Sequence, residues 1–166
     1  MTENKMYHFV AAVALCLLAG YAGSYYATPS IPTWYAGLQK PDITPPSWVF
    51  DPGWVLVGIL SGISLYLIIQ SGSGNRGVKF GLGLFMFQLF LNIGWMFSFF
   101  ALHSTFFGLM AVLLLWMVLL CTIIQIYQFS IPAAMLLVPN FVWVSFAVYF
   151  TYAILVLNPA TFGISV

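Results

Sequence analysis

Five long apolar segments account for most of this chain, and each is long enough to cross a lipid bilayer as a helix. A helix rises about 1.5 Å per residue, so about 20 apolar residues span the roughly 30 Å of bilayer hydrocarbon. Charged residues make up only 4% of the sequence, against about 25% in soluble domains, which excludes a soluble globular protein. The predicted spans are residues 7–26, 52–71, 78–102, 105–129 and 132–157.

Short polar breaks between these segments predict one compact bundle. The break at 71–77 is rich in glycine and serine, and Ser130 with Pro132 marks a tight corner before the last segment. Short connections place consecutive helices beside each other in antiparallel orientation. We therefore expect an all-α integral membrane protein, a single bundle of five transmembrane helices that forms one domain over residues 1–166.

The first segment has two possible interpretations. Lys5 precedes an apolar stretch that ends near small residues, as in a secretory signal peptide. The apolar character continues to residue 27, however, and its tyrosines are typical of a membrane interface, so a retained helix is favoured. With five spans, Lys5, Arg76 and Lys79 would lie on one side of the membrane and Lys40 on the other. This excess on the side of the N-terminus favours a cytoplasmic N-terminus. The expected location is a bacterial or archaeal cell membrane, or the mitochondrial outer membrane of a eukaryote.

Residues suited to acid–base or metal chemistry are scarce and scattered. The three carboxylates lie outside the predicted spans or at their ends, and His8 and His103 lie near span termini. Cys16 and Cys121 lie within apolar runs, where a thiol is usually an inert hydrophobe. No nucleophile motif, phosphate loop or metal-ligand spacing is present. We expect no catalytic acid or base, metal, cofactor or nucleic-acid partner.

The second segment carries a helix-start signal and a face of small residues. Aspartate is a favoured N-cap and proline a favoured first helical residue, so Asp51-Pro52 predicts the start of a helix. Gly58 and Gly62 have the GxxxG spacing typical of close helix packing. Trp54 lies on the same face and fits either a membrane-interface residue or a cavity wall.

Two other segments each place polar and aromatic side chains on one helical face. Amides at membrane depth cost free energy unless they are paired, so these faces should point into the bundle. The amides suit hydrogen bonding between helices and contact with a ligand equally well. With 19% aromatic residues, the chain has enough rings to line a pocket for a flat, largely hydrophobic ligand. The two faces are Gln88, Asn92, Trp95 and Phe99 in the third segment, and Asn140, Trp143, Ala147 and Thr151 in the fifth.

Four fragments lie in order across the predicted spans: residues 34–41 with the Pro45-Pro46 pair, Trp54, residues 88–95 and residues 139–147. Together they resemble the translocator protein family, TspO/MBR. The resemblance covers nearly the whole chain. It implies a five-helix membrane protein, often a homodimer, that binds porphyrins, sterol-like lipids and synthetic aromatic ligands in a pocket closed by the first loop, residues 27–51.

The same resemblance indicates which residues contact the ligand. Carried over by position, the pocket-lining residues are Tyr35, Trp54, Asn92, Trp95, Trp143 and Ala147, and the amide face of the third segment adds Gln88. No basic residue follows Lys79, so the proposed sterol-contact motif is incomplete and high-affinity cholesterol binding is not expected.

Three functions follow as hypotheses. The first is a membrane receptor or transporter for porphyrins that acts in tetrapyrrole sensing or transport. The second is light-dependent degradation of protoporphyrin IX, which in bacterial relatives is associated with the tryptophans that match Trp54 and Trp143. The third is a non-enzymatic membrane scaffold. A homodimer through the third segment is also expected, because Gly77, Gly81 and Gly83 would permit close backbone approach.

Overall fold

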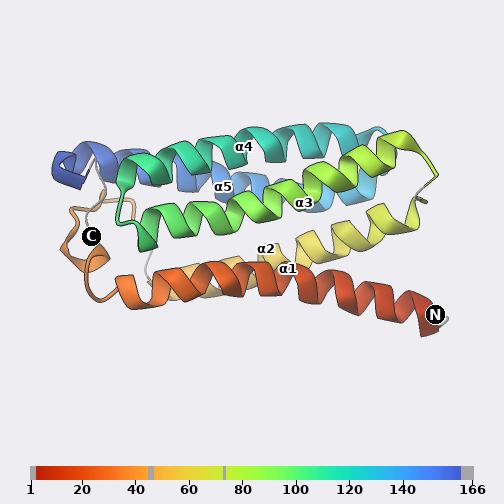
Figure 1. Ribbon diagram of the computed structural model, residues 1–166, viewed down its shortest axis with the longest axis horizontal. Helices are drawn as coiled ribbons and strands as arrows, with labels where there is room; N and C mark the ends of the chain where they lie inside the picture. The colour runs from red at the N-terminus through yellow and green to blue at the C-terminus, as the bar shows by residue number, and fades with distance from the viewer. Residues whose placement is uncertain (1–2, 45–46, 73, 162–166) are drawn as a thin grey trace.

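The computed structural model describes residues 3–44, 47–72 and 74–161, and it describes their side chains except those of residues 3, 4 and 47–51. Five long helices run side by side along the molecule (Figure 1). Each contains a segment long and apolar enough to cross a membrane, so the predicted all-α, five-span, multi-pass architecture is confirmed. The helices are α1 (Glu3–Ser30), α2 (Ser47–Gln70), α3 (Arg76–Met96), α4 (Thr105–Tyr127) and α5 (Ile131–Leu157).

The helices pack in a closed ring in the order α1, α2, α5, α4, α3. One expected neighbour pair is wrong, because α2 and α3 make little contact although a short turn joins them. The partners of α2 are α1 and α5 instead. The Ser64 hydroxyl of α2 donates to the Ala133 carbonyl of α5 at 2.8 Å, inside the bundle.

The glycine face of α2 explains its close approach to α1. An added Cβ at Gly62 would lie 2.5 Å from the Cα of Val13, and one at Gly58 would lie 3.1 Å from Leu17 Cδ2. The backbone of α2 therefore packs directly on the backbone of α1 at Gly62 and on a side chain of α1 at Gly58, as the GxxxG spacing predicts. Any larger residue at position 62 would force the two helices apart.

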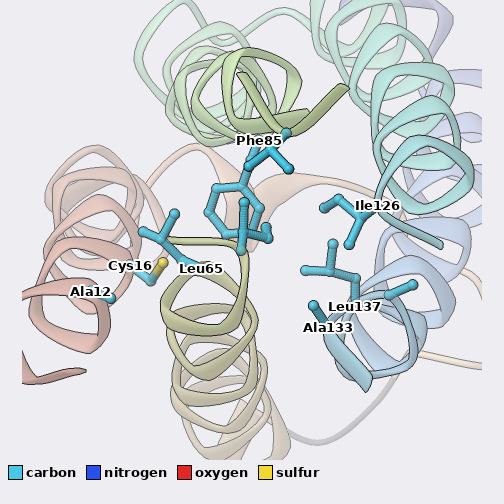
Figure 2. Packing of buried hydrophobic residues seen from close by; sticks show 10 residues of the cluster. Ala12, Cys16, Leu65, Phe85, Ile126, Ala133 and Leu137 are labelled. Atoms are coloured by element: carbon cyan, nitrogen blue, oxygen red, sulfur yellow. The ribbon is translucent and has the colours of Figure 1, made fainter. Parts of the chain in front are cut away.

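A solid core fills the half of the bundle nearest the N-terminus. Figure 2 shows side chains from all five helices meeting there, with Phe85 of α3 directed toward Leu65 of α2. Phe85 is fully buried, so this half leaves no room for a ligand around its ring. The core consists of Ala12, Cys16, Leu65, Ile68, Val78, Phe85, Ile126, Ala133, Ala134 and Leu137.

The predicted loop 27–51 is too long at both ends. Helix α1 continues through Pro29 to Ser30, and α2 begins at Ser47. Pro52 therefore lies inside α2 and does not start it, and the cap predicted for Asp51 falls outside the described side chains. Proline removes one helical hydrogen bond, yet both helices run past a residue that usually breaks them.

The opposite end of the bundle has less regular backbone. After Met96, α3 gives way to a π-helical turn, η2 (Phe97–Ala101), in which Leu102 N–H donates to the Phe97 carbonyl at 3.1 Å. The connection from α1 to α2 lies at the same end, as does the C-terminal end of α5 (Figure 1). The described part of the connection between α1 and α2, residues 31–44, contains the short helix η1 (Tyr35–Gly37). We call residues 31–44 the lid.

Candidate ligand-binding site

A cavity of about 390 Å³ lies under the lid, and aromatic side chains dominate its walls. Its volume falls in the range typical of small-molecule sites, roughly 300 to 1,000 Å³. Residues of α1, the lid, α2, the end of α3 and α5 all contribute to its lining. We call it the aromatic cavity.

Three indoles form the centre of the aromatic cavity. The ring centroid of Trp54 lies 5.9 Å from that of Trp95 at an interplanar angle of 36°, and 5.9 Å from that of Trp143 at 80°. Such offset and edge-on arrangements are the favoured ones for aromatic pairs. Trp54 therefore joins the indole of α3 to that of α5, and all three rings face the cavity.

Small residues make room for these indoles. An added Cβ at Gly53 would lie 2.6 Å from the ring of Trp143, so only glycine permits this contact. Ala147 follows Trp143 by one helical turn and lines the cavity with a methyl group only. Sequence reasoning missed Gly53, because a lone glycine beside a tryptophan has no pattern that marks it as a contact.

A second cavity of about 350 Å³ lies beside the first, and we call it the amide cavity. Its walls include three amide side chains from two helices, Gln88 and Asn92 of α3 and Asn140 of α5. Trp54 lines both cavities. Trp54 and Ser24 thus lie between the aromatic cavity and the amide cavity.

Several buried polar atoms at these cavities have no hydrogen-bond partner among the residues that the structure describes. Both amide atoms of Gln88 are in this state although the side chain is fully buried. A buried polar group without a partner costs about 1 to 3 kcal/mol. Bonding between helices, the structural interpretation of the amide face, therefore does not account for Gln88. The other atoms are Trp95 Nε1, Asn140 Oδ1 and Thr151 Oγ1.

The lid is packed onto the bundle by aromatic and apolar contacts. Leu38 is buried against Phe99, Phe150 and Ile154. Trp34 meets Phe99 edge-on, with ring centroids 5.3 Å apart. The π turn that follows α3 carries Phe99, so the irregular backbone there supplies a surface on which the lid rests.

Polar contacts hold the end of α1, where the lid begins, to the turn after α3. The Ser30 hydroxyl donates to the Phe100 carbonyl at 2.6 Å and is hydrogen-bonded to His103 Nε2 at 3.2 Å. The His103 ring also stacks on Trp34 with centroids 5.0 Å apart. His103 has a φ of 49°, in the left-handed region that non-glycine residues rarely adopt. These contacts stabilise an otherwise unfavourable backbone conformation.

Asn158 clamps the middle of the lid to the end of α5. The Gln39 N–H donates to Asn158 Oδ1 at 2.8 Å, and Asn158 Nδ2 donates to the Gln39 carbonyl at 2.8 Å. Asn158 Nδ2 also donates to the Ile154 carbonyl at 2.8 Å. Sequence reasoning missed Asn158, because its partner lies 119 residues away and no local pattern links them.

Tyr35 brings a phenol to the aromatic cavity from η1. Burial raises the pKa of this phenol to about 12, so it stays neutral and able to donate a hydrogen bond at physiological pH. Its ring lies 5.9 Å from that of Phe100 and 4.6 Å from Lys40 Nζ.

Comparisons with known proteins agree with this architecture. The TspO/MBR family model matches residues 12–157. The chain belongs to the TspO/MBR family. It is 42% identical to the tryptophan-rich protein TspO of Chlorobaculum tepidum, covering 89% of this chain and 93% of that protein, and 40% identical to that of Archaeoglobus fulgidus, covering 90% and 95%. It is 34% identical to the translocator protein of Bos taurus, covering 87% and 88%.

The residues expected to line one pocket, six from the TspO/MBR resemblance and Gln88 from the amide face of α3, divide between two cavities. Tyr35, Trp95, Trp143 and Ala147 line the aromatic cavity, and Gln88 and Asn92 line the amide cavity. Trp54 belongs to both sets. The seven residues therefore line two adjacent cavities that share Trp54, and their binding roles remain predictions.

The three glycines expected at a TspO/MBR dimer interface do not share one outer face. An added Cβ at Gly81 would lie 3.1 Å from the Phe129 ring, and one at Gly77 would lie 3.4 Å from Gln125 Nε2, both within the same chain. Only Gly83 has open space around it. A homodimer through α3 remains a prediction, in which Gly83 is the glycine of these three that could lie at the interface. Disulfide crosslinking of a cysteine placed at position 83 tests it.

Proposed function

We propose that this chain binds porphyrins in the aromatic cavity and acts in tetrapyrrole sensing or transport in the membrane. The observation that carries the proposal is the cluster of Trp54, Trp95 and Trp143 around a cavity of about 390 Å³. Flat, hydrophobic macrocycles stack on indoles, and their few polar groups need few partners. Other aromatic or sterol-like molecules share these properties and are secondary ligands in this proposal.

Two polar groups without a partner among the described residues lie beside the aromatic cavity. They are the Trp95 N–H, a donor, and the Thr151 hydroxyl, which is both donor and acceptor. Both atoms are buried, so a ligand bonds to them only after the side chains that cover them shift, and such a bond removes the cost of leaving them unpaired. The transport role agrees with the name of the bovine relative, translocator protein.

The test is a titration of protoporphyrin IX into the purified protein, followed by tryptophan fluorescence. Replacing Trp143 with phenylalanine should lower the affinity about tenfold, because a smaller ring loses stacking area and about 1.4 kcal/mol. Asn92→Ala, in the neighbouring compartment, should have a smaller effect. The control is Trp116→Phe, since Trp116 donates to Ser145 Oγ at 2.8 Å and lines neither cavity. Unchanged affinity in Trp143→Phe would show that the proposed site is wrong.

Light-dependent breakdown of the bound porphyrin is a second candidate function. The separation of 5.9 Å between the Trp54 and Trp143 rings favours it, because both indoles would lie next to the excited macrocycle. Breakdown of the ring is an oxidation, with dioxygen as the oxidant. Under illumination in air, the porphyrin absorbance should decay faster with wild-type protein than with Trp54→Phe or Trp143→Phe. Equal decay in the absence of protein would remove this candidate.

A further inference from the structure

Lys40 is the one charged side chain that lines the aromatic cavity within the described part of the chain. Its Nζ lies 3.1 Å from the Leu38 carbonyl oxygen and 3.4 Å from that of Ala36. The same ammonium lies 4.6 Å from the centroid of the Tyr35 ring. These contacts orient the lysine across the inner surface of the lid.

None of these partners neutralises the charge. Carbonyl oxygens and an aromatic face stabilise an ammonium group but carry no net negative charge. The ammonium has three N–H donors, and the two carbonyls use two of them. The nearest carboxylate in sequence, Asp42, is exposed and forms no ion pair with any described residue. Among the residues whose side chains are described, nothing neutralises Lys40, and one donor and the positive charge remain available to a ligand.

The position of Lys40 is fixed by its neighbours. Gln39 is clamped through both backbone groups to Asn158, and Leu38 is buried in the core beneath the lid. Lys40 itself is only half-buried. The backbone of the lid is therefore fixed before a ligand binds, and the Nζ contacts with two carbonyls and the Tyr35 ring already orient the side chain, which favours binding.

The location of this charge also selects the orientation of a ligand. The lid connects two spans and lies outside the hydrocarbon, whereas the indoles lie on α2, α3 and α5 within the spans. A carboxylate is costly at membrane depth and favourable at the interface. An amphiphile with a flat ring among the indoles would place its carboxylate at the lid.

We propose that Lys40 binds a carboxylate of the ligand, so that the aromatic cavity selects flat aromatic acids over their neutral analogues. The inference rests on the proposed function and adds the ligand class to it. An ammonium donating to a carboxylate makes a charge-assisted hydrogen bond, which is about twice as strong as a neutral one. Lys40 is a specificity-determining residue in this scheme.

The test compares protoporphyrin IX with its dimethyl ester, which keeps the macrocycle and lacks the negative charges. Both are titrated into wild-type protein, Lys40→Met and Lys40→Arg in lipid nanodiscs. We expect Lys40→Met to weaken binding of the acid about tenfold, and to leave binding of the ester unchanged. Lys40→Arg should retain the preference for the acid. Comparing the acid-to-ester ratio between proteins cancels the partitioning of each porphyrin into lipid.

Two further measurements separate this role from a structural one. Binding of the acid to wild-type protein should weaken as salt is added, and this dependence should be absent in Lys40→Met. Lys79→Met, at the start of α3, is the matched control and should behave as wild type. Equal loss of acid and ester in Lys40→Met, or equal affinity for both in wild type, would overturn the inference and leave the proposed function intact. Saturable binding of neither porphyrin would overturn both.

Discussion

Replacing Gly62 with alanine is expected to lower the free energy of unfolding by about 2 kcal/mol, within the range of about 1 to 3 kcal/mol for overpacked cores. The added Cβ would lie 2.5 Å from the Cα of Val13. Because the obstructing atom is backbone, α1 has to move as a whole for the contact to relax. An SDS titration of the purified protein, followed by circular dichroism, measures the loss.

Gly83→Ala is the matched control for this substitution. It makes the same chemical change in α3, where an added Cβ meets nothing within 4 Å. Alanine forms helix more readily than glycine, by up to about 1 kcal/mol, so this variant should be neutral or slightly stabilised. Similar stabilities for the two variants would contradict the close packing of α1 on α2.

Replacing Trp54 with alanine is expected to produce the largest loss of porphyrin affinity, about 30-fold. Trp54 lines both cavities and contacts the rings of Trp95 and Trp143. Truncating a central aromatic anchor typically costs about 2 kcal/mol or more, which corresponds to that factor. Equilibrium titration of protoporphyrin IX measures the change.

The effect of Trp54→Ala has to be separated from general destabilisation. Trp116→Ala provides the comparison. The indole of Trp116 packs on Phe141, with ring centroids 5.1 Å apart, and lines neither cavity. Both variants lose an indole from the bundle, so both should lose some thermal stability. Only Trp54→Ala should lose affinity, and a parallel loss in Trp116→Ala would argue against a local site.

The sequence alone predicted the elements of this fold better than their arrangement. Apolar length fixes the number of spans, because each must satisfy its backbone hydrogen bonds inside the bilayer. The order of helices around the ring depends on which faces fit, as where Gly62 meets Val13. Loop length carries no such information, which is why α2 and α3 were wrongly expected to be neighbours.

Helix ends were the least predictable local feature. Pro29 and Pro52 both mark helix termini by the usual rules, yet α1 and α2 extend past them. Proline inside a helix removes one backbone donor and usually breaks or kinks the helix, so the usual rule fails at both positions. Residues 27–30 are small or polar and resemble a loop in sequence, so periodicity gives no sign that α1 continues.

Helical spacing predicted which of the proposed site residues share a helix face, but not how they divide between the two cavities. Gln88 and Trp95 lie two turns apart on α3, and that distance separates the amide cavity from the aromatic cavity. The division depends on Trp54, which reaches in from α2. Contacts between distant segments, such as Asn158 with Gln39, depend on tertiary packing that no local pattern encodes.

The most direct measurement is a titration of protoporphyrin IX into wild-type protein in lipid nanodiscs, with empty nanodiscs as the reference. A porphyrin held among Trp54, Trp95 and Trp143 should quench tryptophan fluorescence until one ligand is bound per chain, after which quenching should stop. Quenching that rises in proportion to ligand, with uptake equal to that of empty nanodiscs, would contradict a binding site within the bundle.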